Sequence, residues 1–325
     1  MFKKILGLFL IYALLAVLLL PLLVTALMGG FDTAHMEQAK ALYSLEDYFQ
    51  AQPTTEQTEQ TEQTEQAELN ELESYVMGVV SAEMPALFPM EALKAQAVAA
   101  RTYQIRKMEE NGSDTVLYDI GQAYADTQAQ KEKWGAQYAE YAARIRQAVT
   151  ETQGEIMVYE GEPILAVFHA QSAGKTEDSE NVWVQTVPYL RSVDSSGDNN
   201  APDNTATVTL SAQTVWEALS QYGDLGVSAD ALTFGTPQRS AAGYILAIPV
   251  GNLTLEGSQI RTALGLRSTD FTVSREGDTF TFVTKGYGHG AGMSQYGAKS
   301  LADEGYNYHE ILSRYYTGIS FEKIA

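Results

Sequence analysis

An uncharged apolar segment near the start of the chain constrains its architecture more than any other feature. No side chain of Ile5–Met28 carries a charge, and nearly all of them are apolar. A helix needs about 20 such residues to cross the hydrocarbon core of a membrane. Lys3 and Lys4 precede the segment, whereas Asp32 and Glu37 follow it. Because lysine and arginine are enriched on the cytoplasmic side, we expect a cytoplasmic N-terminus and an extracytoplasmic body.

A cleaved secretory signal is the alternative interpretation of this segment. The apolar cores of signal peptides usually span about 7–15 residues and end at small residues that mark the cleavage site. The segment here is longer, and Leu27-Met28-Gly29-Gly30 is a poor match to such a site. We therefore expect residues 1–30 to hold an uncleaved, single-pass transmembrane helix that places the protein in the cell membrane.

Residues 31–68 are expected to separate the anchor from the folded body. A short helix near the membrane surface is expected at 36–50. From Thr55 to Gln66 the triplet Thr-Glu-Gln occurs four times in succession. The repeat contains nothing apolar to bury, so it predicts a solvated acidic linker. Residues 69–325 then form one extracytoplasmic domain, which is long enough for a sizeable core.

The charge and residue types of the chain argue against several kinds of site. A formal net charge of −20 disfavours electrostatic binding of nucleic acid. The chain has no cysteine, and therefore no disulfide, thiolate nucleophile or cysteine-ligated zinc site. Its four histidines, His35, His169, His289 and His309, include no closely spaced pair. A metal site would require distant residues to converge, so we expect neither a metal nor a cofactor.

The hydrophobic pattern of residues 69–325 predicts an α+β fold. Apolar residues at helical spacing indicate helices, and short apolar runs around polar turns indicate antiparallel hairpins. The expected helices cover residues 69–83, 89–110, 136–152, 211–222, 294–304 and 308–316, and the expected strands cover 156–159, 164–168, 244–250, 253–256, 271–274 and 279–284. Because these elements alternate without regular βαβ spacing, we expect mixed helices and hairpins that form a grooved body.

Glu83 is the first candidate for chemistry. It lies near the end of the first expected helix, because Pro85 disfavours a helical conformation at Met84. A carboxyl group flanked by apolar neighbours can be partly desolvated, which favours its neutral form and suits a general acid. From the residues alone, a solvated charge at a helix end is the plainer interpretation.

Lys94 and Arg101 form a second candidate site on the following helix. They are seven residues apart and therefore share one helix face. Together they could neutralise an anionic ligand. An ordinary surface face, or a salt bridge from Lys94 to Glu91, is the alternative.

Two later loops also carry candidate residues. His169 follows an expected strand and leads into a polar turn, where sites often form. The segment Gly286–Ala298 has glycines at 286, 288, 290 and 292, so its backbone can approach another group closely. It is neither a dinucleotide-binding loop, since only about 30 residues follow, nor a Walker loop, since no Gly-Lys-Ser/Thr follows.

Four blocks of sequence, in order, resemble the stage II sporulation protein D family. The blocks are Val79–Pro85 with Glu91–Tyr103, Phe168–Glu177, Pro188–Asp194, and Gly288–Ala298. The resemblance spans about residues 69–320. It implies a membrane-anchored lytic transglycosylase of spore-forming bacteria, which cuts peptide-free peptidoglycan strands during engulfment of the forespore from the mother-cell membrane at the septum.

The resemblance also implies site residues and partners. Glu83 is implied to be the catalytic acid and base. Residues expected to bind the glycan are Lys94, Arg101, Tyr103, His169, Ser172, Lys175, Tyr189, His289, Gln295 and Tyr296. The implied partners are an amidase, stage II sporulation protein P, and a membrane protein, stage II sporulation protein M. Some relatives are implied to bind zinc through cysteines near the His169 block, and this chain lacks them.

The implied reaction needs one carboxyl group where ordinary glycosidases use two. Glu83 would protonate the oxygen between MurNAc and GlcNAc, and then take the proton from the 6-hydroxyl as a 1,6-anhydro ring closes. Arg101 or Lys94 would hold the lactyl carboxylate, and Glu83 and His289 should face one groove. The alternatives are a non-enzymatic glycan-binding module that activates an amidase, and a cell-wall adhesin.

Overall fold

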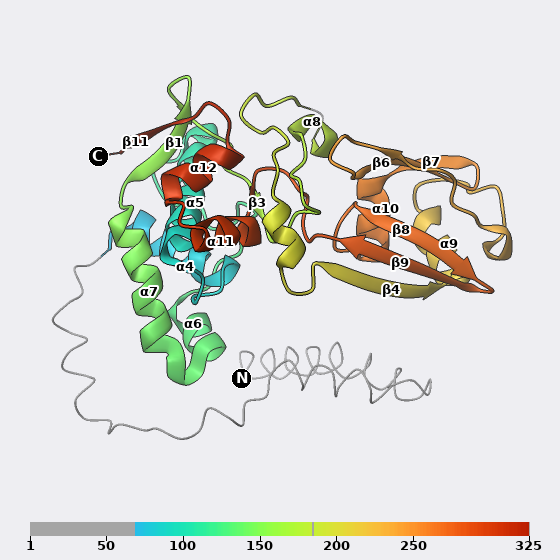
Figure 1. Cartoon of the computed structure of the whole chain (residues 1–325), viewed down its shortest axis with the longest axis horizontal. Coiled ribbons are helices and arrows are strands. Elements are labelled where there is room, and N and C mark those ends of the chain that lie inside the picture. Colours follow the sequence, from blue (N-terminus) through green and yellow to red (C-terminus); the bar gives the residue numbers. More distant parts are fainter. Residues whose placement is uncertain (1–68, 184, 325) are drawn as a thin grey trace, which may run out of the picture. The chain divides into compact units, whose positions relative to one another are not determined.

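The computed structural model describes residues 69–183 and 185–324. The expected anchor and linker, residues 1–68, lie outside this range. Within the described range, no helix is long and apolar enough to cross a membrane. Figure 1 shows the helices gathered in one region of the body, while strands β4 and β6 to β9 form another with helices α9 and α10.

The helical region is built around two helices, α4 (Glu71–Glu83) and α5 (Met90–Asn111). The side chain of Asn70 caps α4 by accepting a hydrogen bond from the Glu73 amide at 2.9 Å. Helix α4 ends where Met84 adopts an extended conformation before Pro85. Many of the buried residues of α5 are alanines, which let its neighbours approach closely on several sides. These neighbours are α4, α7 (Tyr138–Glu151), α11 (Gln295–Asp303) and α12 (Tyr308–Tyr315).

A three-stranded antiparallel sheet packs against α5. Its order is β11 (Ser320–Lys323), β1 (Glu155–Tyr159) and β2 (Glu162–Pro163). The expected strand at 164–168 is wrong, because the chain leaves the sheet after β2 and the Leu165 amide donates to the Tyr189 hydroxyl at 2.8 Å. Part of that segment, β3 (Phe168–His169), instead pairs in parallel with β10 (Met293–Ser294).

The strand-rich region has its own apolar core. One sheet has the order β4 (Thr205–Ser211), β9 (Thr279–Lys285), β8 (Phe271–Glu276), and the other β5 (Gln238–Arg239), β6 (Ile245–Val250), β7 (Leu253–Glu256). Helices α9 (Ala212–Ser220) and α10 (Gly257–Leu264) complete it. Phe271, Phe280 and Phe282 are almost fully buried there. Both antiparallel sheets and the mixture of helices agree with the expected α+β class.

Short helical segments connect these elements. They are α6 (Thr127–Trp134), η2 (Gly135–Gln137), α8 (Ser179–Val182), η3 (Ser196–Asn200) and η4 (Ala229–Ala231). One of them, η3, carries Asp198, whose buried carboxylate accepts hydrogen bonds from the hydroxyls of Ser172, Ser195 and Ser294. Burial raises the pKa of Asp198, and these hydrogen bonds oppose that shift. The contacts tie the segment around β3 to the start of α11.

Candidate functional site

Glu83 is the last residue of α4, and its half-buried carboxylate is held from two sides. Its Oε1 accepts a hydrogen bond from the backbone amide of Ala123 at 2.9 Å. Its Oε2 accepts one from Gln295 Nε2 at 3.4 Å, and the same nitrogen donates to Gln96 Oε1 at 3.3 Å. Residues from the first and last motifs of the sequence therefore meet at Glu83.

A cavity of about 350 Å³, here called the Glu83 pocket, lies beside this carboxylate. Most of its wall is apolar. Its lining residues are Ala82, Glu83, Met84, Pro85, Ala86, Leu87, Lys133, Trp134 and Tyr141. Apolar walls with a few convergent polar groups are typical of binding sites.

Lys133 is the cationic neighbour of Glu83 in this pocket, and the sequence analysis did not single it out. Its Nζ donates to the carbonyl of Ser81 at 2.9 Å, near the C-terminal end of α4. Burial lowers the pKa of Lys133, and the nearby Glu83 carboxylate opposes that shift. The lysine thus places a positive charge close to the carboxylate.

A cluster of three tyrosines lies beside Glu83, with Tyr75 on α4 and Tyr118 and Tyr124 on the loop that carries Ala123, and it too escaped the sequence analysis. The rings of Tyr75 and Tyr124 stack with centroids 5.6 Å apart, and Tyr118 packs edge-on against both. Tyr118 and Tyr124 are 50% and 39% exposed. Partly exposed aromatic rings beside Ala123 suit the apolar faces of sugars. The available signal was the two tyrosines six residues apart between the expected helices 89–110 and 136–152.

Gln295 and Tyr296 are the two expected glycan-binding residues that lie near Glu83. Gln295 contacts the carboxylate directly. The Tyr296 ring packs edge-on against Phe88, with centroids 5.0 Å apart, just beyond the Leu87 end of the pocket. The start of α11 thus contributes to this site, as the glycine-rich motif predicted.

Arg101 is not placed to bind a glycan, which contradicts the expected role. Its side chain is fully buried and forms a two-pronged pair with Glu73, with Nε–Oε1 at 2.9 Å and Nη2–Oε2 at 2.6 Å. Its Nη1 also donates to the Glu155 carbonyl at 3.0 Å. Arg101 therefore joins α4, α5 and β1 inside the core, and the expected clamp on a lactyl carboxylate is wrong for this residue.

Lys94 follows the alternative interpretation of the sequence. It forms salt bridges with Glu91 at 2.9 Å and with Glu151 at 2.6 Å. Its Nζ also lies 5.8 Å from the centre of the Tyr308 ring. Lys94 thus links α5, α7 and α12 and does not line the Glu83 pocket.

Four other residues that were expected to bind the glycan lie outside the Glu83 pocket, and three of them form contacts within the protein. The Tyr103 hydroxyl donates to the Ile120 carbonyl at 3.1 Å. Tyr189 is buried and accepts from the Leu165 amide, and Ser172 is buried against Asp198. Lys175 is exposed on the loop that follows β3. None of the four lines the Glu83 pocket.

His169 and His289 lie next to each other, with ring centroids 5.6 Å apart. His169 Nδ1 donates to the Ala291 carbonyl at 3.0 Å, which leaves its buried Nε2 unprotonated and without a partner. Burial and the neighbouring His289 lower the pKa of His169 to about 3. Burial and Arg261 lower the pKa of His289 to about 4. Both rings are therefore neutral at neutral pH.

His289 lines a second cavity of about 560 Å³, here called the His289 pocket. It does not line the Glu83 pocket, so His289 and Glu83 line different cavities, whereas Gln295 contacts Glu83 directly. In the part of the chain that the structure describes, no three histidines or carboxylates gather as metal ligands.

Comparison with known proteins relates the sequence of this chain to a family. The family model described as stage II sporulation protein (SpoIID) matches residues 58–159. Stage II sporulation protein D of Bacillus subtilis (strain 168) is 41% identical over 257 residues, which cover 76% of this chain and 73% of that protein. The Bacillus amyloliquefaciens protein of the same name is 39% identical over 262 residues, covering 78% and 74%.

A more distant relative has a name that suggests another role. The amidase enhancer of Bacillus subtilis (strain 168) is 31% identical over 294 residues. The aligned region covers 74% of this chain and 39% of that longer protein.

Proposed function

The chain belongs to the stage II sporulation protein D family, and from this premise we propose that it is a lytic transglycosylase acting on peptidoglycan during sporulation. Its substrate would be a peptide-free glycan strand, cleaved between MurNAc and GlcNAc. The observation that carries the proposal is the Glu83 carboxylate, which is held by two donors at the wall of a mostly apolar pocket.

Glu83 would act first as an acid and then as a base. In its neutral form the carboxyl group gives its proton to the glycosidic oxygen, and the bond from that oxygen to C1 of MurNAc breaks. The carboxylate then accepts the proton of the MurNAc 6-hydroxyl, whose oxygen closes onto C1. The GlcNAc end leaves with a hydroxyl, the MurNAc end carries a 1,6-anhydro ring, and no water is consumed.

The neighbours of Glu83 support this sequence of steps. Ala123 N–H and Gln295 Nε2 fix the direction of the carboxylate, so its oxygens need not reorganise when substrate arrives. The charge of Lys133 would stabilise the carboxylate that remains after the first proton transfer. Trp134 and the exposed tyrosines Tyr118 and Tyr124 would contact sugar faces.

We also propose the location and partners of the protein. Residues 1–30 would anchor it in the membrane with the N-terminus in the cytoplasm, and residues 31–68 would link the anchor to the extracytoplasmic domain 69–325. In sporulating cells it would work at the engulfing septum with stage II sporulation proteins P and M.

A non-enzymatic role is the second candidate, because one relative is named an amidase enhancer. In that case the body would bind the glycan and stimulate a cell-wall amidase without cutting the strand. A carbohydrate pocket is compatible with both roles, so the reaction product decides between them.

The test uses the purified full chain, peptide-free glycan strands and mass spectrometry of the products. We expect fragments with 1,6-anhydroMurNAc ends from wild type and none from Glu83→Gln. Glu109→Gln, which removes an exposed carboxylate on α5, is the matched control and should cleave like wild type. Cleavage that persists in Glu83→Gln contradicts the mechanism. Amidase stimulation without any cleavage by wild type favours the second candidate.

A further inference from the structure

The His289 pocket is a site that the proposed reaction leaves unused. Its walls come from α8 and the residues just after it, from the start of β6, from α10 and from the glycine-rich segment. At about 560 Å³ it is larger than the Glu83 pocket and falls in the size range of small-molecule sites. The side chains that line it therefore need an explanation of their own.

Arg261 is the group in this pocket that lacks a partner. It lies in the last turn of α10, and no described residue forms a hydrogen bond or ion pair with its guanidinium. Its Nε is buried and unsatisfied. Burial lowers the pKa of Arg261, and the Tyr287 hydroxyl opposes that shift. Because a half-buried cation without a partner is costly, this position favours an anionic ligand.

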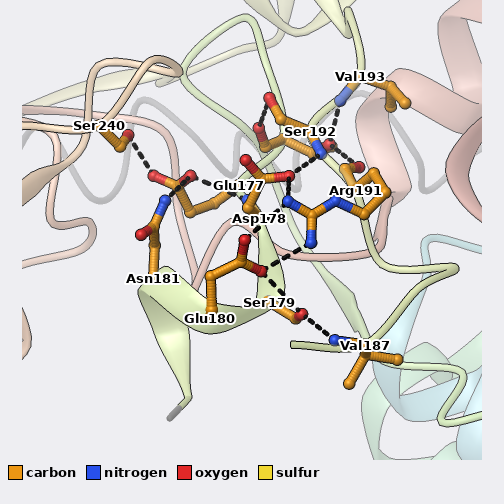
Figure 2. A network of polar contacts seen from close by, with 11 residues as sticks. Glu177, Asp178, Ser179, Glu180, Asn181, Val187, Arg191, Ser192, Val193 and Ser240 are labelled. Atoms are coloured by element: carbon orange, nitrogen blue, oxygen red, sulfur yellow. Dashed lines mark hydrogen bonds and ion pairs between the residues drawn. The ribbon is translucent and has the colours of Figure 1, made fainter. Parts of the chain in front are cut away.

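The carboxylates of the same pocket are occupied by other partners. Glu180 accepts two hydrogen bonds from Arg191, at 2.7 and 2.8 Å, and this pairing lowers the pKa of Glu180 to about 2. Glu177 Oε1 accepts from the Asp178 amide and from Asn181 Nδ2, both at 2.9 Å, and Oε2 accepts from Ser240. Figure 2 shows this network around Arg191, with Glu177 and Glu180 turned toward their partners.

The remaining pocket carboxylate is also engaged. Glu256 accepts from the Ser258 hydroxyl at 3.0 Å at the start of α10. None of the three glutamates forms an ion pair with Arg261, although all of them line the same cavity. Glu180 is paired with Arg191, whereas Glu177 and Glu256 are held in place by neutral donors, so Arg261 is left without a partner among the described residues.

An aromatic wall completes the pocket. Trp183 is 37% exposed, and its ring lies 5.2 Å from that of His289. The neutral His289 ring adds no competing charge at neutral pH. An exposed indole face beside a free guanidinium suits a ligand that has an apolar ring face and a carboxylate.

We propose that the His289 pocket binds a carboxylate-bearing sugar of the glycan, with Arg261 pairing with the carboxylate and Trp183 covering the ring. This inference rests on the proposed glycan substrate. The lactyl group of MurNAc is a carboxylate only after its stem peptide has been removed, because a peptide converts it into an amide. Arg261 would then be the residue that selects peptide-free strands.

The position of the pocket fits a strand that also reaches Glu83. His289 lines the His289 pocket, and Gln295, six residues later, contacts Glu83. Six residues span at most about 21 Å, so the two pockets are close enough for one strand of several sugars to reach both.

The test measures binding, so it does not depend on cleavage. The full chain carrying Glu83→Gln is titrated with two glycan probes of equal length. One is a peptide-free MurNAc–GlcNAc strand, which carries lactyl carboxylates, and the other is a chitooligosaccharide, which lacks them. We expect the MurNAc strand to bind about tenfold more tightly, as one charge-assisted pair provides. Arg261→Gln should abolish this preference, whereas Trp183→Ala should weaken both probes.

Two controls keep the test decisive. Arg146→Gln on α7 removes the same charge away from either pocket and should preserve the tenfold preference. Thermal unfolding shows whether Arg261→Gln is folded, and Arg261→Lys, which retains the charge, should keep part of the preference. Equal binding of both probes by the parent, or an unchanged preference in folded Arg261→Gln, would overturn the proposal.

Failure of this inference and failure of the proposed function give different results. If wild type cuts glycan while Arg261→Gln binds with unchanged preference, the enzyme stands and the subsite is wrong. If the preference depends on Arg261 and wild type makes no 1,6-anhydro product, the subsite stands and the lytic reaction is wrong.

Discussion

The Glu83 pocket and the His289 pocket are both lined by acidic and basic side chains, yet they differ in the charge that they offer to a ligand. In the first, a half-buried carboxylate faces the cavity and Lys133 is turned to the carbonyls of α4. In the second, three glutamates are bound to other groups, and Arg261 has no partner in the part of the chain that the structure describes. The character of each pocket is thus decided by which charges are already paired, and a count of charged residues would miss it.

Removal of the Glu83 carboxylate should have the largest effect. General acid–base groups contribute about 10²- to 10⁴-fold to a rate, so we expect Glu83→Gln to lower the cleavage rate by at least about 10³-fold. Binding of chitooligosaccharide should remain, because that probe has no need of the carboxylate. Initial rates and titrations on the same preparation measure both, and a variant that loses binding and keeps its rate per bound strand would contradict the assignment.

A comparison of two arginines should give the next largest effect. Arg101 is paired with Glu73 in the core, so Arg101→Met leaves a buried carboxylate alone and should cost about 3–5 kcal/mol of unfolding free energy. Arg261→Met removes an unpaired cation and should cost little stability. Chemical denaturation of both variants measures the difference. Equal losses would mean that Arg261 has a partner in solution.

The pH dependence of stability should identify the buried histidine beside the second pocket. The folded-state pKa of His169, about 3, lies below the ordinary value of 6.5, so the unfolded chain binds the proton more readily. The stability linked to His169 is therefore full above about pH 6.5 and is lost as the pH falls toward 3. Between pH 7 and 5 we expect a loss of about 2 kcal/mol from this group.

The control for that measurement is His169→Gln, which cannot take up a proton in this range. Unfolding curves at pH 7 and pH 5 should show a smaller loss for the variant than for wild type. Parallel losses in both proteins would assign the acid sensitivity to other groups.

The smallest expected effect concerns the loop that orients Glu83. A Cβ at Gly78 would clash with the Tyr124 ring, so Gly78→Ala must displace this ring, which packs beside Ala123 on the same loop. Alanine normally stabilises a helix interior by about 1 kcal/mol relative to glycine, whereas here we expect a net loss of about 1–2 kcal/mol. Thermal unfolding gives the sign directly. A more stable variant with unchanged cleavage would show that the loop does not depend on this contact.

The parts of the fold that depend on local signals could be predicted. Pro85 and Gly112 delimit α4 and α5 in the sequence, and Gly112 does adopt a left-handed conformation at the end of α5. The hairpin of β8 and β9 follows from alternating residues around a short polar turn. The strand β4, which is nowhere fully buried, and the helix α10 were missed.

The site was harder to predict, because pairing between distant residues decides it. Spacing placed Lys94 and Arg101 on one face of α5 but could not show that this face meets Glu73 and Glu151 rather than solvent. Lys133 and Ala123 reach Glu83 from 50 and 40 positions along the chain, and no local pattern marks such contacts. Gln295 was found because it belongs to a motif whose family role was recognisable.

The hydrogen bond from Gln295 to Glu83 joins residues 212 positions apart. A ribosome therefore adds Gln295 only 212 residues after Glu83. Until then the Oε2 atom of Glu83 lacks its hydrogen bond from Gln295. Nascent chains and truncations that end before Gln295 therefore lack the assembled site, and the proposed lytic activity should be absent from them.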